Sequence, residues 1–195
     1  MSTQIRILTY NVSWEGQTGK LSNGADGRLC VSNGVNVCTS NVLSLIAGSN
    51  ADIVLLQEAS IDVSRLPSEY KYVQHVSGLE TMITAYKPAV VGNVQSVIRG
   101  EFESERPFLI TVFPRLVVVN VHRPHTQNAL KDTTTLENAL ASKSALLHSR
   151  SVILGGDFNM ELPVNPTFFN KELDVGLHLQ PRKTCCSASF GVRDK

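Results

Sequence analysis

The chain has 195 residues, 42% of them hydrophobic and 18% charged, which suffices for a buried core and is too apolar for a disordered chain. Its formal net charge of +1 gives no broad basic field. Composition therefore argues against nonspecific binding of long duplex DNA, although it says nothing about a small phosphoester. The length predicts a single domain over residues 1–195.

The termini and cysteines indicate the compartment. Residues 1–11 lack the apolar core of a signal peptide, and the longest apolar stretches are too short to span a bilayer. We therefore expect a cytoplasmic protein without a transmembrane segment. The sequence leaves the oligomeric state open, and a monomer is favoured. The cysteines are expected to be reduced thiols, and a zinc site built from all of them is an alternative without a recognised spacing. They are Cys30, Cys38, Cys185 and Cys186.

Short runs rich in apolar or β-branched residues predict the strands. These runs are Ile5–Asn11, Ile53–Gln57, Tyr72–Val76, Thr81–Tyr86, Val90–Ile98, Phe108–Phe113, Leu116–His122 and Ser151–Asp157. Short helices are expected at Ser40–Ala47 and near Phe168–Leu173. A capping box formed by Thr134 and Glu137 predicts a long helix that ends near Arg150. Many short strands with few helices favour an α+β fold with paired sheets.

The segment Glu15–Ser40 is rich in glycine, asparagine and serine, which predicts a long loop. A loop of this length in a compact domain is usually functional or mobile. Because it follows the first strand, it can act as a flap that gates a substrate. A surface insertion without a role is an equal alternative.

Four predicted strands end in charged, amide or imidazole side chains. Asn11 and His122 are the last residues of two of them, Glu58 follows a third, and Asp157 ends the fourth, after Gly155-Gly156, with Asn159 two residues further on. Each residue alone has an ordinary explanation as a solvated, turn or structural side chain. Sheets can collect the ends of buried strands into one rigid pocket, so the conjunction predicts a catalytic constellation.

These residue types suit the attack of water on a phosphoester. Glu58 is a hard oxygen donor of the kind that binds Mg²⁺ or Mn²⁺, and Asp157 can orient the water or accept its proton. Asn11 and Asn159 can donate hydrogen bonds to phosphate oxygens, and His122 can donate one as charge builds. The sequence contains no Walker P-loop, dinucleotide-binding glycine pattern or nucleophile elbow.

The order of these motifs resembles the endonuclease/exonuclease/phosphatase superfamily. The resemblance rests on TYN at Thr9–Asn11, DIVLLQE at Asp52–Glu58, NVH at Asn120–His122 and GGDFN at Gly155–Asn159, with a weak extension to Thr184. It implies a DNase I-like four-layer α/β sandwich of two mostly antiparallel sheets flanked by helices. It also implies metal-dependent hydrolysis of a phosphoester by water.

The resemblance assigns a role to each residue. Glu58 is the metal ligand, and Asn11 helps to organise the metal and the phosphate. His122 contacts or protonates the phosphate, Asp157 orients or activates the water, and Asn159 holds the scissile phosphate.

One motif of the superfamily is missing. The pattern closes with Ser-Asp-His, which does not occur here, and the only histidine after Asp157 is His178. We expect that the chain lacks the final strands, about 25–50 residues on a domain-size argument. Two alternatives stay open: a degenerate relative that binds without cleaving, or substitution by His125 or His178. Without the closing pair we expect little turnover, because members of a coupled catalytic set act as a unit.

Two functions compete. The first is a hydrolase of phosphodiesters or phosphomonoesters, with a nuclease as a special case, and the second is an inactive module that binds phosphoesters or a protein partner. A nucleic-acid substrate calls for basic and stacking side chains near the site. The candidates are Tyr10, Trp14, Arg99, Arg106, Arg123 and Arg150. Arg123, next to His122, is the first candidate for phosphate binding.

Overall fold

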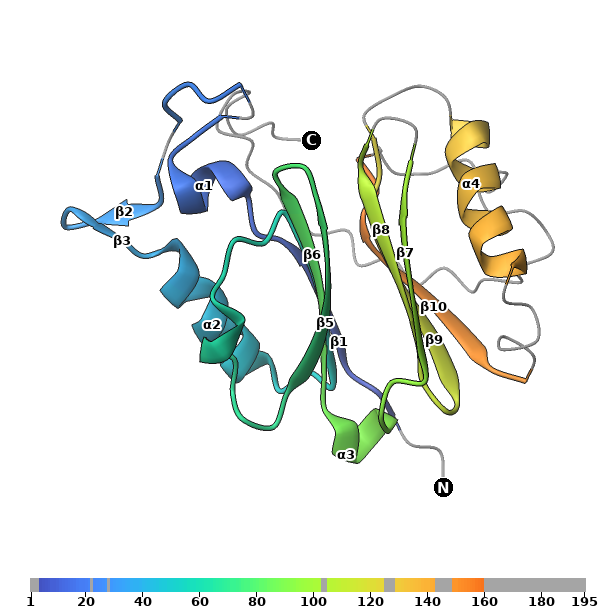
Figure 1. Cartoon of the computed structure of the whole chain (residues 1–195). Coiled ribbons are helices and arrows are strands. Elements are labelled where there is room, and N and C mark those ends of the chain that lie inside the picture. Colours follow the sequence, from blue (N-terminus) through green and yellow to red (C-terminus); the bar gives the residue numbers. More distant parts are fainter. Residues whose placement is uncertain are drawn as a thin grey trace.

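Three strands are buried along their whole length and form the centre of the structure. They are β4 (Ile53–Gln57), β8 (Pro107–Val112) and β9 (Leu116–His122). The computed structural model describes residues 4–21, 23–27, 29–102, 105–124, 129–142 and 149–159. Two four-stranded sheets face each other, with β4 inside one and β8 and β9 inside the other (Figure 1).

The two sheets have the same plan. The first has the order β1-β4-β6-β5 and the second the order β10-β9-β8-β7. The remaining strands are β1 (Ile7–Asn11), β5 (Lys71–Ser77), β6 (Glu80–Tyr86), β7 (Ser96–Glu101) and β10 (Ser151–Asp157). In each sheet one edge pair, β1 with β4 or β10 with β9, is parallel and the other pairs are antiparallel. The predicted class, α+β with two mostly antiparallel sheets, is confirmed.

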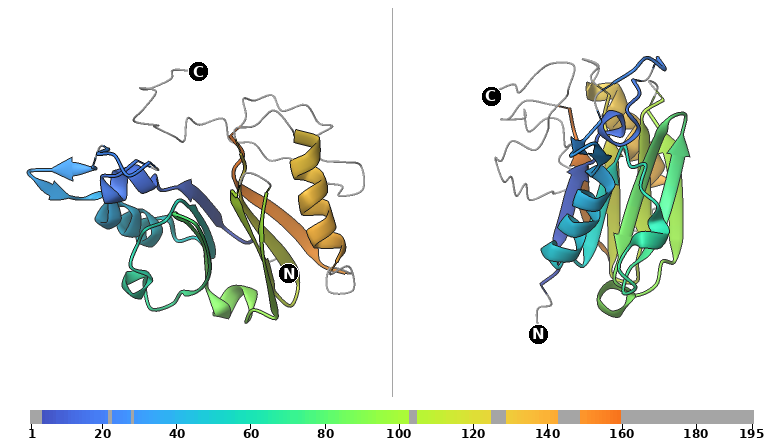
Figure 2. Two further views of the ribbon diagram at one scale, coloured as in Figure 1. Left: turned by 45° about the horizontal axis from the view of Figure 1, so that its top comes forward. Right: turned by 90° about the vertical axis from the view of Figure 1, so that its left-hand side faces the viewer.

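Helices cover the outer faces of both sheets. Helix α2 (Cys38–Ser49) packs on the first sheet and α4 (Ala129–Ala141) on the second, and Figure 2 shows them on opposite sides of the sheet pair. Apolar side chains fill three layers between these elements: α2 with the first sheet, the two sheets with each other, and the second sheet with α4. The arrangement is the expected four-layer sandwich.

Side-chain alternation decides which residues face which layer. In β4, Val54 and Leu56 pack toward α2, whereas Ile53 and Leu55 pack between the sheets. Gln57 continues the second series and donates from Nε2 to Oδ1 of Asn120 on β9, 2.7 Å away in the opposite sheet. The interior between the sheets is therefore apolar in its middle and polar toward the ends of the strands.

The segment expected to be a loop, Glu15–Ser40, contains regular structure. It holds most of α1 (Trp14–Thr18), a hairpin of β2 (Val31–Ser32) and β3 (Val35–Asn36), and the start of α2. The prediction of one long loop was wrong because Ser13 caps α1, accepting a hydrogen bond at Oγ from the backbone N–H of Gly16 at 3.3 Å.

The other large differences from the prediction concern two segments, whereas several strand and helix ends differ by one or two residues. The expected strand Val90–Ile98 is divided between α3 (Pro88–Val91) and β7, because Pro88 favours the first turn of a helix and Gly92, at φ 83°, ends it. Helix α4 begins before Thr134, so the expected capping box lies inside the helix. Arg150 lies outside α4 and donates from Nε to the carbonyl of Phe113 at 2.9 Å.

The smaller elements complete the description. A 3₁₀ turn, η1, spans Val63–Arg65. The helix expected near Phe168–Leu173 lies outside the described residues. No helix in the described ranges is both long and apolar enough to cross a membrane. The monomeric state and the cytoplasmic location stay predictions.

The glycine pair before Asp157 is required by close packing. A Cβ on Gly155 would lie 2.8 Å from Cδ1 of Leu55 in the facing sheet, and one on Gly156 would lie 2.0 Å from the carbonyl oxygen of Val121 on β9. Gly156 also has φ 140°, which side chains rarely adopt. The strand can therefore bring Asp157 to His122 only with glycine at this position.

We predict that Gly156→Ala lowers the free energy of unfolding by about 2–4 kcal/mol, because the new Cβ pushes β10 away from β9. Urea unfolding followed by circular dichroism measures it. Gly48→Ala is the matched control: Gly48 is exposed within α2, and a Cβ there meets nothing within 4 Å. That variant should gain about 1 kcal/mol. Equal losses in both variants would contradict this account of Gly156.

Candidate active site

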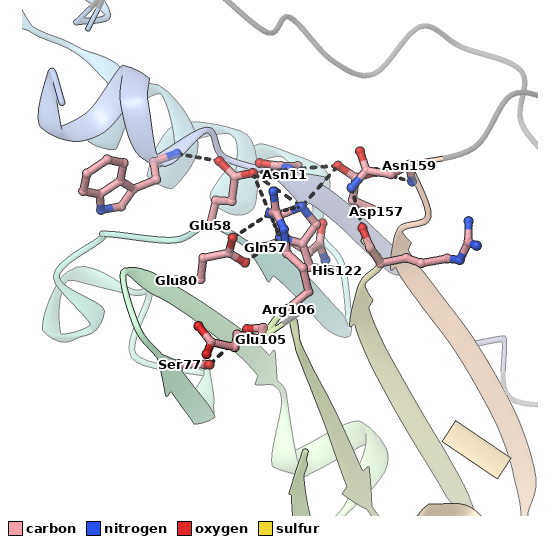
Figure 3. Close-up of polar contacts among 12 residues, drawn as sticks. Asn11, Gln57, Glu58, Ser77, Glu80, Glu105, Arg106, His122, Asp157 and Asn159 are labelled. Atoms are coloured by element: carbon pink, nitrogen blue, oxygen red, sulfur yellow. Dashed lines mark hydrogen bonds and ion pairs between the residues drawn. The ribbon is translucent and has the colours of Figure 1, made fainter. Parts of the chain in front are cut away.

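The polar strand ends meet at one mouth of the sheet pair (Figure 3). Asn11 ends β1 and joins two carboxylates: its Nδ2 donates to Oε1 of Glu58 at 3.2 Å and to Oδ2 of Asp157 at 2.9 Å. Asn11 is held in turn, because its Oδ1 accepts the backbone N–H of Ser13 at 2.9 Å. The side-chain amide of Asn11 therefore connects Glu58 and Asp157, so that three predicted site residues from both sheets are joined.

Glu58 reaches this cluster through an unusual backbone conformation. It follows Gln57 and has φ 53°, in the left-handed region, which interrupts the alternation of β4. The backbone N–H of Trp14 donates to Glu58 Oε2 at 3.0 Å, and Nε2 of Gln17 donates to the Glu58 carbonyl at 2.8 Å. Helix α1 thus holds both the carboxylate and the backbone of Glu58.

His122 lies almost completely buried between three carboxylates. Its side chain is 1% exposed. Nδ1 lies 2.8 Å from Oε2 of Glu80, and Nε2 lies 3.4 Å from Oε1 of Glu58 and 3.9 Å from Oδ2 of Asp157. Because a carboxylate only accepts, Nδ1–H donates to Glu80 and fixes the ring. The other nitrogen, Nε2, faces Glu58, the predicted metal ligand, and Asp157, the residue predicted to orient the water.

Arg106 is the cation of the cluster. Its Nη1 lies 2.6 Å from Oε1 of Glu80 and 3.6 Å from Oε1 of Glu58. The same Nη1 lies 2.9 Å from Nδ1 of His122 and 2.7 Å from Nε2. A guanidinium only donates, and Nδ1–H is already given to Glu80, so Arg106 donates to Nε2. Glu80 and Arg106 therefore hold the imidazole in one tautomer.

Asp157 and Asn159 form a tight turn after β10. The backbone N–H of Asn159 donates to Oδ1 of Asp157 at 2.9 Å, and its Nδ2 donates to the carbonyl of Arg123 at 2.6 Å. Asn159 has φ 47°, again in the left-handed region. Both oxygens of Asp157 therefore have donors, one from Asn11 and one from Asn159.

The Arg123 side chain does not join the cluster. It is buried, and its Nε lies 3.4 Å from Oδ2 of Asp132 on α4. Arg123 contributes its backbone, because its N–H donates to the Asp157 carbonyl at 2.8 Å. The predicted substitutes for the missing histidine, His125 and His178, lie outside the described residues.

Sequence reasoning missed the part of the site that comes from the β5–β6 hairpin. Glu80, which begins β6, was not identified, and Arg106, which precedes β8, was named only among four arginine candidates for contacts to a nucleic acid. An acidic residue that begins a strand two positions after Gly78 carries no pattern of its own. The antiparallel pairing of β6 with β4 brings the start of β6 beside the end of β4. Prediction of this pairing would have been needed to identify Glu80.

The donors present fit a hard divalent cation. Within the described ranges, no group of three or more His, Cys, Asp or Glu side chains has the arrangement of a complete metal cage. Mg²⁺ is commonly bound through one or two carboxylates, with water and substrate phosphate filling the other positions. The Glu58 carboxylate, held by the Asn11 amide, matches that mode better than a closed zinc site.

Two facing sheets with polar strand ends at one mouth define a DNase I-like sandwich. The chain belongs to the Endonuclease/Exonuclease/phosphatase family, whose model matches residues 8–193. This is a superfamily of phosphoester hydrolases, whose members generally depend on a divalent metal. Comparison with curated protein sequences gives no significant match.

Solved structures share the fold at low sequence identity. D. rerio TDP2 complexed with single strand DNA product is 16% identical with a TM-score of 0.57, covering 80% of this chain and 61% of that one. Truncated Caenorhabditis elegans TDP2 is 16% identical with a TM-score of 0.58, covering 80% and 63%. The 3'-5' exonuclease NExo from Neisseria Meningitidis is 19% identical with a TM-score of 0.50, covering 80% and 58%. The chain thus spans less than two thirds of these structures.

We predict that Arg106→Met lowers the free energy of unfolding by about 1–2 kcal/mol, because Glu80 and Glu58 lose a partly buried cation. Chemical unfolding at neutral pH measures the change. Lys20→Met is the control, since Lys20 pairs with Asp26 where the two side chains are 52% and 89% exposed. Its effect should stay below about 0.5 kcal/mol. Similar small losses for both variants would contradict a structural role for Arg106.

Proposed function

We propose that this chain is a divalent-metal-dependent hydrolase that cleaves a phosphoester by attack of water. The single observation that carries the proposal is the Asn11 amide, which joins the carboxylates of Glu58 and Asp157 beside His122. Membership of the family supports it independently.

Glu58 is the proposed metal ligand, with Asn11 organising the metal and the phosphate. When Mg²⁺ or Mn²⁺ is bound there, it polarises a phosphoryl oxygen and stabilises developing negative charge. Helix α1 fixes Glu58 through the Trp14 N–H, so the carboxylate is positioned before any ligand arrives.

Asp157 is the proposed residue that orients the water and accepts its proton. Its two oxygens are fixed by Asn11 and by the backbone of Asn159, which limits rotation of the carboxylate. A fixed acceptor holds the nucleophile in line with the phosphorus without an ordering cost during the reaction.

His122, Arg106 and Asn159 are the proposed donors to the phosphate. His122 is oriented through Nδ1 by Glu80, which leaves Nε2 directed toward the centre of the cluster. Nη1 of Arg106 lies 2.7 Å from this nitrogen, which in the tautomer set by Glu80 accepts its hydrogen bond. A phosphate oxygen that takes the Arg106 hydrogen bond frees Nε2 to carry a proton and to donate to a second oxygen.

Nucleic acid is the first substrate class to test. Two neighbours with this fold were solved with DNA products, one with a single strand and one, a 3' phosphatase, with a hairpin. The net charge of +1 favours a substrate contacted at few phosphates, such as a strand end, over a long duplex.

A binding module without turnover is the second candidate. Arg106 already places positive charge beside Glu58, the proposed metal ligand, while it pairs with Glu80. The sequence also lacks the Ser-Asp-His of the superfamily pattern. Such a module would bind a phosphoester and leave it intact.

We predict that Glu58→Gln weakens metal binding, whereas Asp157→Asn keeps most of it and lowers hydrolysis about 10²–10⁴-fold. Metal binding is measured by fluorescence of Trp14, the only tryptophan, whose N–H touches Glu58. Hydrolysis is measured on single-stranded DNA with a 3' phosphate and on a generic phosphodiester, with Mg²⁺ or Mn²⁺ added.

Asp26→Asn is the control, because Asp26 is 89% exposed and lies outside the cluster. It should match the unchanged protein in both assays. Metal-dependent binding of DNA without hydrolysis in the unchanged protein would favour the binding module. Hydrolysis that survives Glu58→Gln and Asp157→Asn would refute the assignment of this site.

A further inference from the structure

Two thiols converge on one face of Gly16 in helix α1. A Cβ built on Gly16 would lie 3.3 Å from Sγ of Cys30 and 3.5 Å from Sγ of Cys38. The two sulfur atoms therefore lie together in the space that a side chain on Gly16 would fill. Cys30 is exposed, whereas Cys38 is 7% exposed and lies at the start of α2.

The backbone brings the two cysteines together at the base of the β2–β3 hairpin. The N–H of Val37 donates to the Cys30 carbonyl at 2.8 Å, so Cys38 is one residue beyond the partner of Cys30. The N–H of Cys30 donates to the Gly16 carbonyl at 2.9 Å, and Nδ2 of Asn36 donates to the Gln17 carbonyl at 2.7 Å. The hairpin is thus attached to α1 by hydrogen bonds at both of its ends.

We propose that Cys30 and Cys38 form a reversible disulfide under oxidising conditions, which closes the base of the hairpin against Gly16. Two thiols that merely fill space as small apolar groups require neither mutual contact nor access from solvent. Here both sulfur atoms lie beside the same Cβ position of Gly16 and one thiol is exposed, which brings the pair within reach of each other and of an external oxidant.

The reaction is a thiol–disulfide exchange with a small-molecule disulfide such as oxidised glutathione. The exposed Cys30 thiol gives its proton to the buffer and its sulfur attacks one sulfur of the oxidant, whose S–S bond breaks, so that one glutathione leaves as a thiolate and takes up a proton. The Cys38 sulfur loses its proton to water and attacks the Cys30 sulfur of the mixed disulfide, and the second glutathione leaves. Two protein thiols are oxidised, and one oxidant disulfide is reduced to two thiols.

The order of attack follows from burial. Burial and the contact with Cys30 raise the pKa of the Cys38 thiol to about 12, so Cys38 stays protonated at neutral pH. Cys30 therefore meets the oxidant first, and Cys38 resolves the mixed disulfide from within the structure. In a reducing compartment both cysteines stay as thiols, so the disulfide forms only when the surroundings become oxidising.

The test uses the full chain, first reduced and then incubated with oxidised glutathione in mildly alkaline buffer. Trypsin cleaves after Arg28 and Arg65, so both thiols lie in the peptide 29–65, whereas Cys185 and Cys186 lie in the peptide 184–193. We expect the first peptide to lose two hydrogen atoms and to resist alkylation until dithiothreitol is added. The melting temperature should rise by about 5 °C, because a short loop is closed.

Cys30→Ser is the main variant, because its side chain is exposed and the substitution should not impair folding. It should show neither the mass loss nor the rise in melting temperature. The double variant Cys185→Ser/Cys186→Ser should show both. The proposal is overturned by a stable glutathione adduct on Cys30 with Cys38 still open to alkylation, by a link between the two peptides, or by a closed form that melts lower than the open form.

Discussion

Side-chain alternation in strands buried on both faces is the constraint on which the rest of this structure depends. Each residue of β4 and β9 must serve either a helix layer or the layer between the sheets. Where the inner series becomes polar, the groups must find partners, since a buried polar group without one costs about 1–3 kcal/mol. Gln57 and Asn120 therefore bond across the sheets. The same series of inward-facing residues in β9 continues to His122. The packing of the core therefore determines which side chains face the site.

Glu58 shows how the structure departs from that register. Strict alternation would direct its side chain toward the α2 layer, and the left-handed backbone at this residue turns it to the site. Such a conformation in a residue other than glycine costs energy and persists only where its surroundings fix it. Trp14 and Gln17 of α1 supply the fixing hydrogen bonds. The short helix in the segment expected to be a loop thus maintains the position of the proposed metal ligand.

Sequence reasoning predicted those features that depend on local pattern. The strands Ile53–Gln57, Leu116–His122 and Ser151–Asp157 have the predicted bounds, because apolar runs with turn residues at their ends identify buried strands. Features fixed by tertiary contacts escaped prediction. Glu80 joins the cluster through the register of β6 against β4, and Arg123 turns to Asp132 on a helix whose start was misplaced by the pattern at Thr134.

The charges of the cluster bear on the proposed pairing of a divalent cation with a phosphoester. Among the described side chains, the carboxylates of Glu58, Glu80 and Asp157 all lie within 4 Å of a nitrogen of His122, and Arg106 pairs with the first two. One guanidinium offsets only part of that negative charge, so an anionic phosphoester alone is repelled. A divalent cation held by Glu58 would offset part of that excess, and Arg106 would then be free to pair with a phosphate oxygen as well as with Glu80. On this charge balance, the proposed site would favour a phosphoester more strongly with the cation present than without it.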